Sequence, residues 1–150
     1  MLIIKKIISN FNTDKVTNMS LMFHYCDSLK ELNLSNFNTD KVTDMNSMFK
    51  YCSSLKELNL NNFNNNVIDM ERMFYRCHSL KKLNIINFNT NKVGNMNYMF
   101  FGCSSVEEFI FNNFNIKKTS YKIRMFDRCS KEVEMKIRSK NKNIEDEEFF

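Results

Sequence analysis

Apolar residues recur along this chain with a period of 25 or 26 residues. The motif "NFN" occurs five times, each copy is followed by an "MF" pair, and a cysteine stands three residues after the phenylalanine of that pair. The five motifs are centred on Phe11, Phe37, Phe63, Phe88 and Phe114. The intervening letters change between copies while the apolar positions stay in phase. A neutral duplication would not preserve that phase, so the pattern predicts structural units stacked on one another.

The first part of each unit predicts a β-strand followed by a bend. In "LKELNLSNFN", Leu32 and Leu34 are two residues apart and should face the core, while Glu31, Asn33 and Ser35 face solvent. The asparagines that flank each central phenylalanine predict the bend, because asparagine side chains hydrogen-bond the local backbone there. A glycan ligand bound at these asparagines is the alternative interpretation.

The second part of each unit predicts a short helix. In "VTDMNSMFKYC", apolar residues stand at i, i+3, i+6, i+7 and i+10, counted from Val42. This spacing is typical of the buried stripe of a helix. Thr43 or Asp44 is a suitable N-cap, since a short oxygen-bearing side chain accepts hydrogen bonds from the first backbone N–H groups.

Single units of this length bury too few apolar side chains to offset the entropy of ordering them, so neighbours must share a core. The expected division is an N-terminal capping strand at 1–10, five tandem repeats at 11–130, and a C-terminal capping strand with a charged tail at 131–150. Imperfect caps would leave strand edges open at the ends, which predicts end-to-end self-association as one mode of assembly.

The unit "LKELNLSNFNTDKVTDMNSMFKYCSS", from Leu29 to Ser54, resembles the 26-residue repeat of bacterial surface proteins that are grouped with BspA-like leucine-rich repeat proteins. The resemblance covers roughly residues 8 to 130. It implies an α/β repeat solenoid, a right-handed coil with one parallel β-sheet and one short helix per unit. It also implies a cell-surface or extracellular location, a role in adhesion or protein binding, and no enzymatic activity.

Net charge and the length of the apolar segments bear on the location of the protein. The formal net charge is +5, from 22 basic and 17 acidic side chains of mixed distribution. No stretch of about twenty apolar residues predicts a membrane-spanning helix. The start, "MLIIKKIISNF", lacks the order of charged region, long apolar region and cleavage site of an export signal. A cytoplasmic location is therefore the alternative to the surface.

Cysteine and histidine positions predict neither a metal site nor catalysis. The cysteines are at least 25 residues apart, so none forms the close pair of a zinc site, and a buried ladder of free thiols is expected. Most methionines lie in the apolar stripe that begins at Val42 and its equivalents, and they are expected in the core. His24 and His78 occupy different phases of the repeat and are expected at the surface. No motif for a cofactor or a catalytic nucleophile is present, so no cofactor is expected.

The outward positions of the strands are the candidate binding residues, because they vary from unit to unit while the inward positions do not. Ile86 and Ile110 are expected as exposed apolar anchors within a polar rim. A merely solvated sheet face is the alternative. The candidates are Lys30, Glu31, Asn33, Lys56, Glu57, Asn59, Lys81, Lys82, Asn84, Ile86, Glu107, Glu108, Ile110 and Asn112.

Taken together, the sequence predicts a non-enzymatic module that binds a protein or glycoprotein through its sheet face. An intracellular interaction scaffold, or a truncated member of an expanded repeat family, is the first alternative. Nucleic-acid binding is less favoured and no nucleic-acid partner is expected, because the lysines of the sheet are accompanied by glutamates and no aromatic-and-basic stripe runs along that face.

Overall fold

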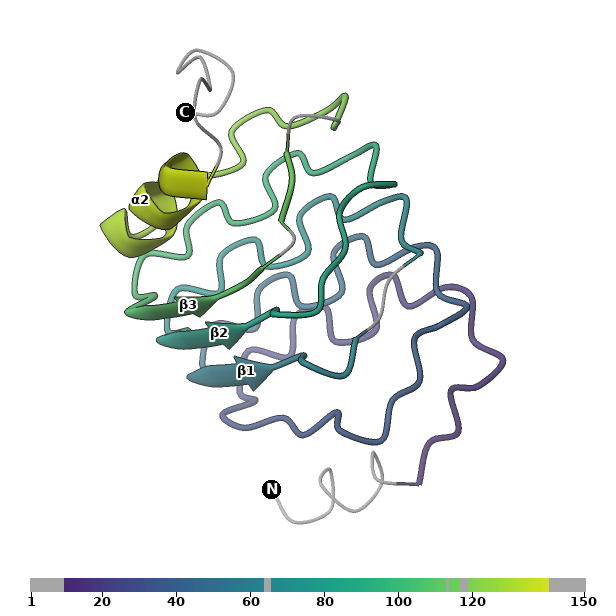
Figure 1. Ribbon diagram of the computed structural model, residues 1–150. Coiled ribbons are helices and arrows are strands. Elements are labelled where there is room, and N and C mark those ends of the chain that lie inside the picture. Colours follow the sequence, from purple (N-terminus) through teal and green to yellow (C-terminus); the bar gives the residue numbers. More distant parts are fainter. Residues whose placement is uncertain (1–9, 64–65, 113, 117–118, 141–150) are drawn as a thin grey trace.

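The computed structural model describes residues 10–63, 66–112, 114–116 and 119–140 (Figure 1). Three strands, β1 (Glu57–Asn59), β2 (Lys82–Asn84) and β3 (Glu108–Ile110), form one sheet in the order β1-β2-β3, and both pairings are parallel. A helix, α2 (Lys131–Lys140), follows them. The expected combination of a parallel sheet with units repeated along the chain is confirmed for this part of the fold.

Strand pairing keeps the repeat in register. Leu58 pairs with Leu83, and Leu83 pairs with Phe109, so the equivalent residue of each unit lies in one column. All three side chains are buried, whereas their neighbours within each strand are exposed or half-buried. This alternation is the reason why "ELN", "KLN" and "EFI" form strands, because successive side chains of a strand point to opposite faces.

The prediction of a short helix in each unit is wrong. Across 44–52 the backbone runs as a series of turns, and the amides of Ser47 and Phe49 donate to the carbonyls of Glu71 and Met73 in the next unit, at 2.8 and 2.9 Å. The intervening amides, such as that of Met48, close turns onto the residue three positions earlier. Among the described residues, α2 is the sole helix.

Backbone dihedral angles give the physical reason for this difference. Residues in the left-handed region interrupt each expected helix twice, since an L-residue with positive φ cannot continue a right-handed helix. They are Leu21, Tyr25, Ser47, Tyr51, Arg72, Arg76, Tyr98, Gly102, Arg124 and Arg128. We call the resulting segments, 18–26, 44–52, 69–77, 95–103 and 121–129, the turn ladder. Parallel bridges run through it from Asn18 to Asp44, Asp69, Asn95 and Tyr121.

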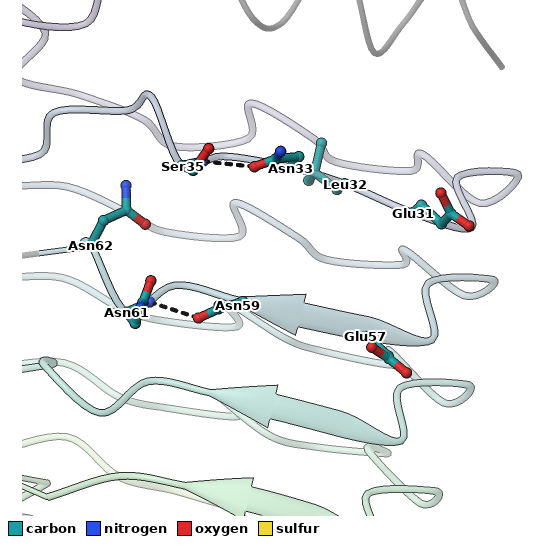
Figure 2. A pocket seen from close by; sticks show the side chains of 8 residues that line it. All are labelled: Glu31, Leu32, Asn33, Ser35, Glu57, Asn59, Asn61 and Asn62. Atoms are coloured by element: carbon teal, nitrogen blue, oxygen red, sulfur yellow. Dashed lines mark hydrogen bonds between the residues drawn. The ribbon is translucent and has the colours of Figure 1, made fainter.

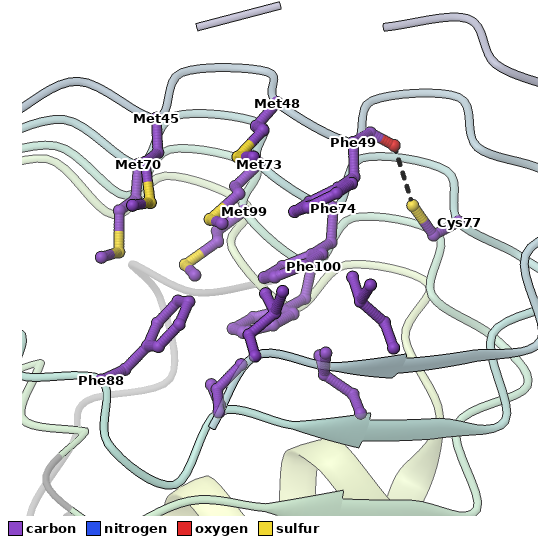
Figure 3. Packing of buried hydrophobic residues seen from close by; sticks show 14 of the residues in the cluster. Met45, Met48, Phe49, Met70, Met73, Phe74, Cys77, Phe88, Met99 and Phe100 are labelled. Atoms are coloured by element: carbon purple, nitrogen blue, oxygen red, sulfur yellow. Dashed lines mark hydrogen bonds between the residues drawn. The ribbon is translucent and has the colours of Figure 1, made fainter. Parts of the chain in front are cut away.

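The core lies between the turn ladder and the strands (Figure 3). Phe49, Phe74 and Phe100 stack in one column with ring centroids 5.7 and 5.5 Å apart and nearly parallel rings, and all three are fully buried. Met48, Met73 and Met99 form a second column beside them. The expectation that the methionines of this phase are core residues is confirmed for these columns.

The buried thiol ladder is also confirmed in its centre. Cys52, Cys77 and Cys103 are fully buried, and the five cysteines are free thiols. Each of the three Sγ atoms donates to a phenylalanine carbonyl in the preceding unit; for Cys77 the acceptor is the carbonyl of Phe49, at 3.1 Å (Figure 3). Cys26 and Cys129, in the first and last units, are only half-buried.

Hydrogen bonds explain the recurring "NFNT". The buried Thr90 hydroxyl donates to the carbonyl of Asn115 at 2.9 Å and accepts from its amide at 2.7 Å, so it joins two neighbouring bends. Thr13 makes the same pair of bonds to Asn38. The side-chain amide of Asn62 donates to two carbonyls of the preceding unit. These contacts favour the structural interpretation of the asparagines.

A helix, rather than the expected C-terminal capping strand, follows the last unit. Val133 and Ile137, four residues apart, are the buried residues of α2, and the Ser130 hydroxyl accepts from the amide of Val133 at the helix start. The Lys136 ammonium donates to the carbonyl of Phe109 at 2.9 Å, so α2 covers β3 (Figure 1). The expected N-terminal capping strand and the charged tail lie outside the described residues.

Within the described ranges, no helix has the length and apolar character that crossing a membrane requires.

Candidate binding surface on the strand side

All fourteen candidate residues lie on the surface of the molecule. We call the outward side of β1, β2 and β3 with their flanking residues the strand face. Register brings Glu57, Lys82 and Glu108 into one column and Asn59, Asn84 and Ile110 into the next. None of the fourteen side chains is buried, so the prediction that they point away from the core is confirmed. Their role in binding stays a prediction.

Charges on the strand face largely compensate one another. The Lys82 ammonium lies 2.7 Å from a carboxylate oxygen of Glu108, and Lys81 lies 2.8 Å from Glu107. The hydrogen bond to Glu108 and the charge of that carboxylate raise the pKa of Lys82, with a smaller contribution from Glu57. Lys81 and Lys82 are therefore neutralised by neighbouring glutamates, as the sequence predicted for these two.

A groove of about 320 Å³ crosses the strand face at the first two units (Figure 2). Its lining consists of carboxylates, side-chain amides, one hydroxyl and one aliphatic side chain. The lining residues are Glu31, Leu32, Asn33, Ser35, Glu57, Asn59, Asn61 and Asn62. No basic residue contributes to the lining, so the groove is acidic at the end that holds the two glutamates.

The asparagines of the groove are fixed by local turns. The Asn33 side-chain oxygen accepts from the amide of Ser35 at 3.0 Å, and the Asn59 oxygen accepts from Asn61 at 3.1 Å (Figure 2). The NH₂ groups of Asn33 and Asn59 have no hydrogen-bond partner in the part of the chain that is described. The groove thus presents amide donors beside carboxylate acceptors, which suits an extended segment that carries carbonyls and a cationic group.

Some residues of this surface differ from the sequence prediction. The strand expected around Leu32 and Leu34 does not form, since 29–34 is irregular and the described strands begin with β1. Leu32 was also expected in the core, but it is half-buried and lines the groove. Ile86 and Ile110 were expected as exposed anchors, but both are half-buried. Ile110 lies in a second hollow, of about 310 Å³, between β3 and α2. The covering helix, which the sequence did not predict, explains the burial of Ile110.

Asn61 and Asn62 line the groove although the sequence analysis did not select them as binding residues. Asn61 stands two residues after Asn59, where the backbone leaves the strand and turns. The repeat pattern could have identified these two asparagines. Side chains at the junction of strand and bend in neighbouring units must lie beside the outward strand residues.

Titratable side chains elsewhere form no metal-binding arrangement in the described ranges. No group of three or more histidine, cysteine, aspartate or glutamate side chains could hold a metal ion there. His78 is exposed, as predicted, whereas His24 is half-buried, and its Nε2 atom has no partner within the described structure. Burial, followed by the charge of Lys50, lowers the pKa of His24.

Sequence comparison adds the family. A model of the family described as "Mycoplasma protein of unknown function, DUF285" matches residues 3–83 and, in a second and overlapping match, residues 59–147. The chain belongs to this family. Two overlapping matches within one DUF285 chain agree with the internal repeat. No curated protein and no solved structure matched the chain. The family description names no activity, so the function of this DUF285 chain must be argued from its surfaces.

Proposed function

We propose that this DUF285 chain is a non-enzymatic binding module, a leucine-rich-repeat-type solenoid of the BspA-like kind, whose strand face binds a protein or glycoprotein partner. The observation that carries the proposal is the groove of about 320 Å³ on that face. Its walls are built by equivalent positions of two neighbouring units, while the inward residues of the same strands are fixed by the core.

Recognition in this groove would use backbone and charge together. Extended peptides offer carbonyls that the NH₂ groups of Asn33 and Asn59 can bind, and a lysine or arginine of the peptide would lie near Glu31 and Glu57. The pairing of Lys81 and Lys82 with glutamates leaves little positive charge around β2 and β3 for a nucleic acid. A cationic, extended segment of a protein is therefore the partner that this face fits best.

An array of synthetic peptides that differ in charge tests this proposal. Wild-type protein should retain extended peptides that carry lysine or arginine, and the double variant Glu31→Lys with Glu57→Lys should lose them. The matched control, Asp27→Lys with Asp40→Lys, makes the same change in charge at exposed positions outside the groove and should bind as wild type does. Equal binding by all three proteins, or none by wild type, would refute the role of the groove.

We extend the proposal to a cell-surface location, with an intracellular scaffold as the alternative. Protease treatment of intact source cells distinguishes the two. Release of peptides of this chain without lysis would support adhesion at the surface. Protection of the chain until the cells are lysed would transfer the search for a partner to intracellular proteins.

A further inference from the structure

A second surface lies on the outer side of the turn ladder, across the core from the strands. Aromatic and basic side chains of successive units meet there, at the two positions that precede Cys52 and Cys77 and at one of the two that precede Cys103 and Cys129. The remaining positions hold Gly102 and Asp127, and Asp127 is paired with Arg124. The Phe101 ring is buried. We call this surface the aromatic–cation stripe and define it by Lys50, Tyr51, Tyr75, Arg76, Phe101 and Arg128. The proposed function of the strand face makes no use of it.

The rings of the stripe form a continuous row along the stacking direction. Tyr51 and Tyr75 meet edge to face with centroids 5.5 Å apart, and Tyr75 stacks on Phe101 at 4.9 Å. At the other end, Tyr25 stacks on Tyr51 at 4.4 Å. Each ring thereby fixes its neighbour, because the units that carry them are joined by the backbone hydrogen bonds of the turn ladder.

The cations rest on these rings. The Lys50 ammonium lies 5.6 Å from the Tyr51 centroid and 5.7 Å from that of Tyr75, and the Arg76 guanidinium lies 5.9 and 5.8 Å from the same two rings. The Arg128 guanidinium lies 5.7 Å from the Phe101 centroid. A ring face attracts a cation without neutralising it, so these contacts orient the side chains and leave their charge available.

Charge pairing distinguishes the stripe from the part of the strand face around β2 and β3. Lys50, Arg76 and Arg128 have no carboxylate partner among the described residues. By contrast, Lys81 and Lys82 of the strand face each bind a glutamate. The uncompensated cations belong to three different units of a stack whose neighbours lie about 5 Å apart. An extended polyanion that runs along the stack could contact all three.

Two further observations select among polyanions. One face of Tyr51 is stacked on Tyr25 and one face of Tyr75 on Phe101, and cations lie beside both rings, so these two tyrosines are less suited to stack a nucleobase than free rings are. Tyr25, at the end of the row, is 60% exposed. The phenol hydroxyls of Tyr51 and Tyr75 have no hydrogen-bond partner within the described ranges, and both side chains are partly exposed. Guanidinium groups bind sulfate and carboxylate oxygens through paired N–H donors, and free phenols bind hydroxyls.

We propose that the aromatic–cation stripe binds a sulfated polysaccharide, with the chain laid along the stacked units, the sulfates on Lys50, Arg76 and Arg128, and the sugar hydroxyls on the tyrosines.

Heparin is the probe for the test, with affinity measured by calorimetry over a range of salt concentrations. The double variant Arg76→Gln with Arg128→Gln should bind about a hundredfold more weakly than wild type, since each lost charged hydrogen bond contributes about tenfold. Its dependence on salt should also be shallower. Lys81→Gln with Lys82→Gln removes the same formal charge from the strand face and should stay within about twofold of wild type.

Four results would overturn the proposal. One is that wild type does not bind heparin, and another is that both double variants lose affinity equally, which would mean attraction by net charge alone. The third is that single-stranded oligothymidylate binds as tightly as heparin and competes with it, which would assign the stripe to nucleic acid. The fourth is that Tyr51→Phe with Tyr75→Phe keeps the full affinity for heparin, since the phenols would then play no part. Thermal unfolding of each variant verifies that it is folded.

Discussion

The strands and the turn ladder join the same units on opposite sides of one core, and they do so with different backbones. The strand side uses extended residues in runs of three and places one fully buried side chain per strand into the core, such as Leu83. The turn side uses turns with positive φ and buries several, including Met73, Phe74 and Cys77 in one segment. The described strands link three units, whereas the bridges of the turn ladder link five.

The difference indicates where stability and recognition reside. The turn ladder buries more apolar side chains than the three strands do and carries the longest continuous line of hydrogen bonds, so it should contribute more than the strands to the free energy of unfolding. The strand face contributes exposed side chains whose identity the core does not restrict. The outer side of the turn ladder combines a rigid support with side chains that are available for binding. Its rings are fixed by the ladder, and its cations remain unpaired.

The largest expected effect on the free energy of unfolding comes from truncating a buried side chain, once in the turn ladder and once in a strand. Phe74→Ala should lower the free energy of unfolding by about 3–5 kcal/mol, because its ring is fully buried and stacked on Phe49 and Phe100. Leu83→Ala on the strand side should cost less, within the range of about 2–5 kcal/mol. Chemical denaturation measures both. A greater loss for Leu83→Ala would contradict a dominant turn side.

Alkaline pH should lower the free energy of unfolding through the buried thiols of the turn ladder. Burial raises the pKa of the Cys52 thiol from its ordinary 9.0 to about 12. The folded state therefore keeps a proton that the unfolded state releases, so the contribution is complete below about pH 9 and is lost as the pH rises toward about 12. Each such thiol lowers the free energy of unfolding by about 1.4 kcal/mol per pH unit within that window.

Denaturation of wild type and of Cys52→Ala, at several values between about pH 8 and about pH 11, measures this slope. The variant should show a shallower decline. All other side chains are the same in both proteins, so the difference between the two slopes isolates the thiol. Parallel curves for the two proteins would show that the buried thiol does not contribute.

A matched pair of glycine substitutions tests the left-handed positions of the turn ladder. Gly102 has a φ of 73°, and an added Cβ would lie 3.3 Å from Cγ of Arg76, so Gly102→Ala should cost about 1 kcal/mol. Gly94 has no positive φ, and its Cβ would lie 3.9 Å from the nearest backbone oxygen, that of Ile68. Gly94→Ala should be neutral or slightly stabilising. Equal costs in denaturation experiments would contradict the assigned backbone.

The smallest effect is expected on the strand face. Lys81→Ala removes an exposed ion pair with Glu107, whose attraction is screened by water. We expect no measurable change in the free energy of unfolding, at low or at moderate salt. A clear loss at low salt would show that the strand face contributes to stability and is not free to vary for recognition.

Sequence periodicity predicted the units, the bends, the thiol ladder and the strands of three units, but it also predicted a strand around Leu32 that does not form, and helices where the structure has turns. The reason is that inward positions at Met45, Met48, Phe49 and Cys52 fit both a helix and a series of three-residue turns with left-handed residues between them. Hydrophobic spacing records which side chains face the core, and it does not record which carbonyl each amide reaches.

Two other features of the structure differ from the sequence prediction for similar reasons. Val133, Met135 and Ile137 alternate along the sequence and so resemble a strand, yet Met135 is 60% exposed, and the two buried residues are four apart in α2. The aromatic–cation stripe was not predicted, because Arg76 occupies the repeat position of Tyr51. Rings and cations that alternate between units come together only after the units stack.

One measurement tests the central claim, that a turn ladder and not a set of helices holds the units and both faces in register. Scalar couplings across hydrogen bonds, measured by NMR on labelled protein, identify the carbonyl that each amide reaches. The amide nitrogen of Phe49 should couple to the carbonyl carbon of Met73, one unit further along the chain. Coupling of Phe49 to Met45, as the i→i−4 bond of a helix requires, would contradict the account.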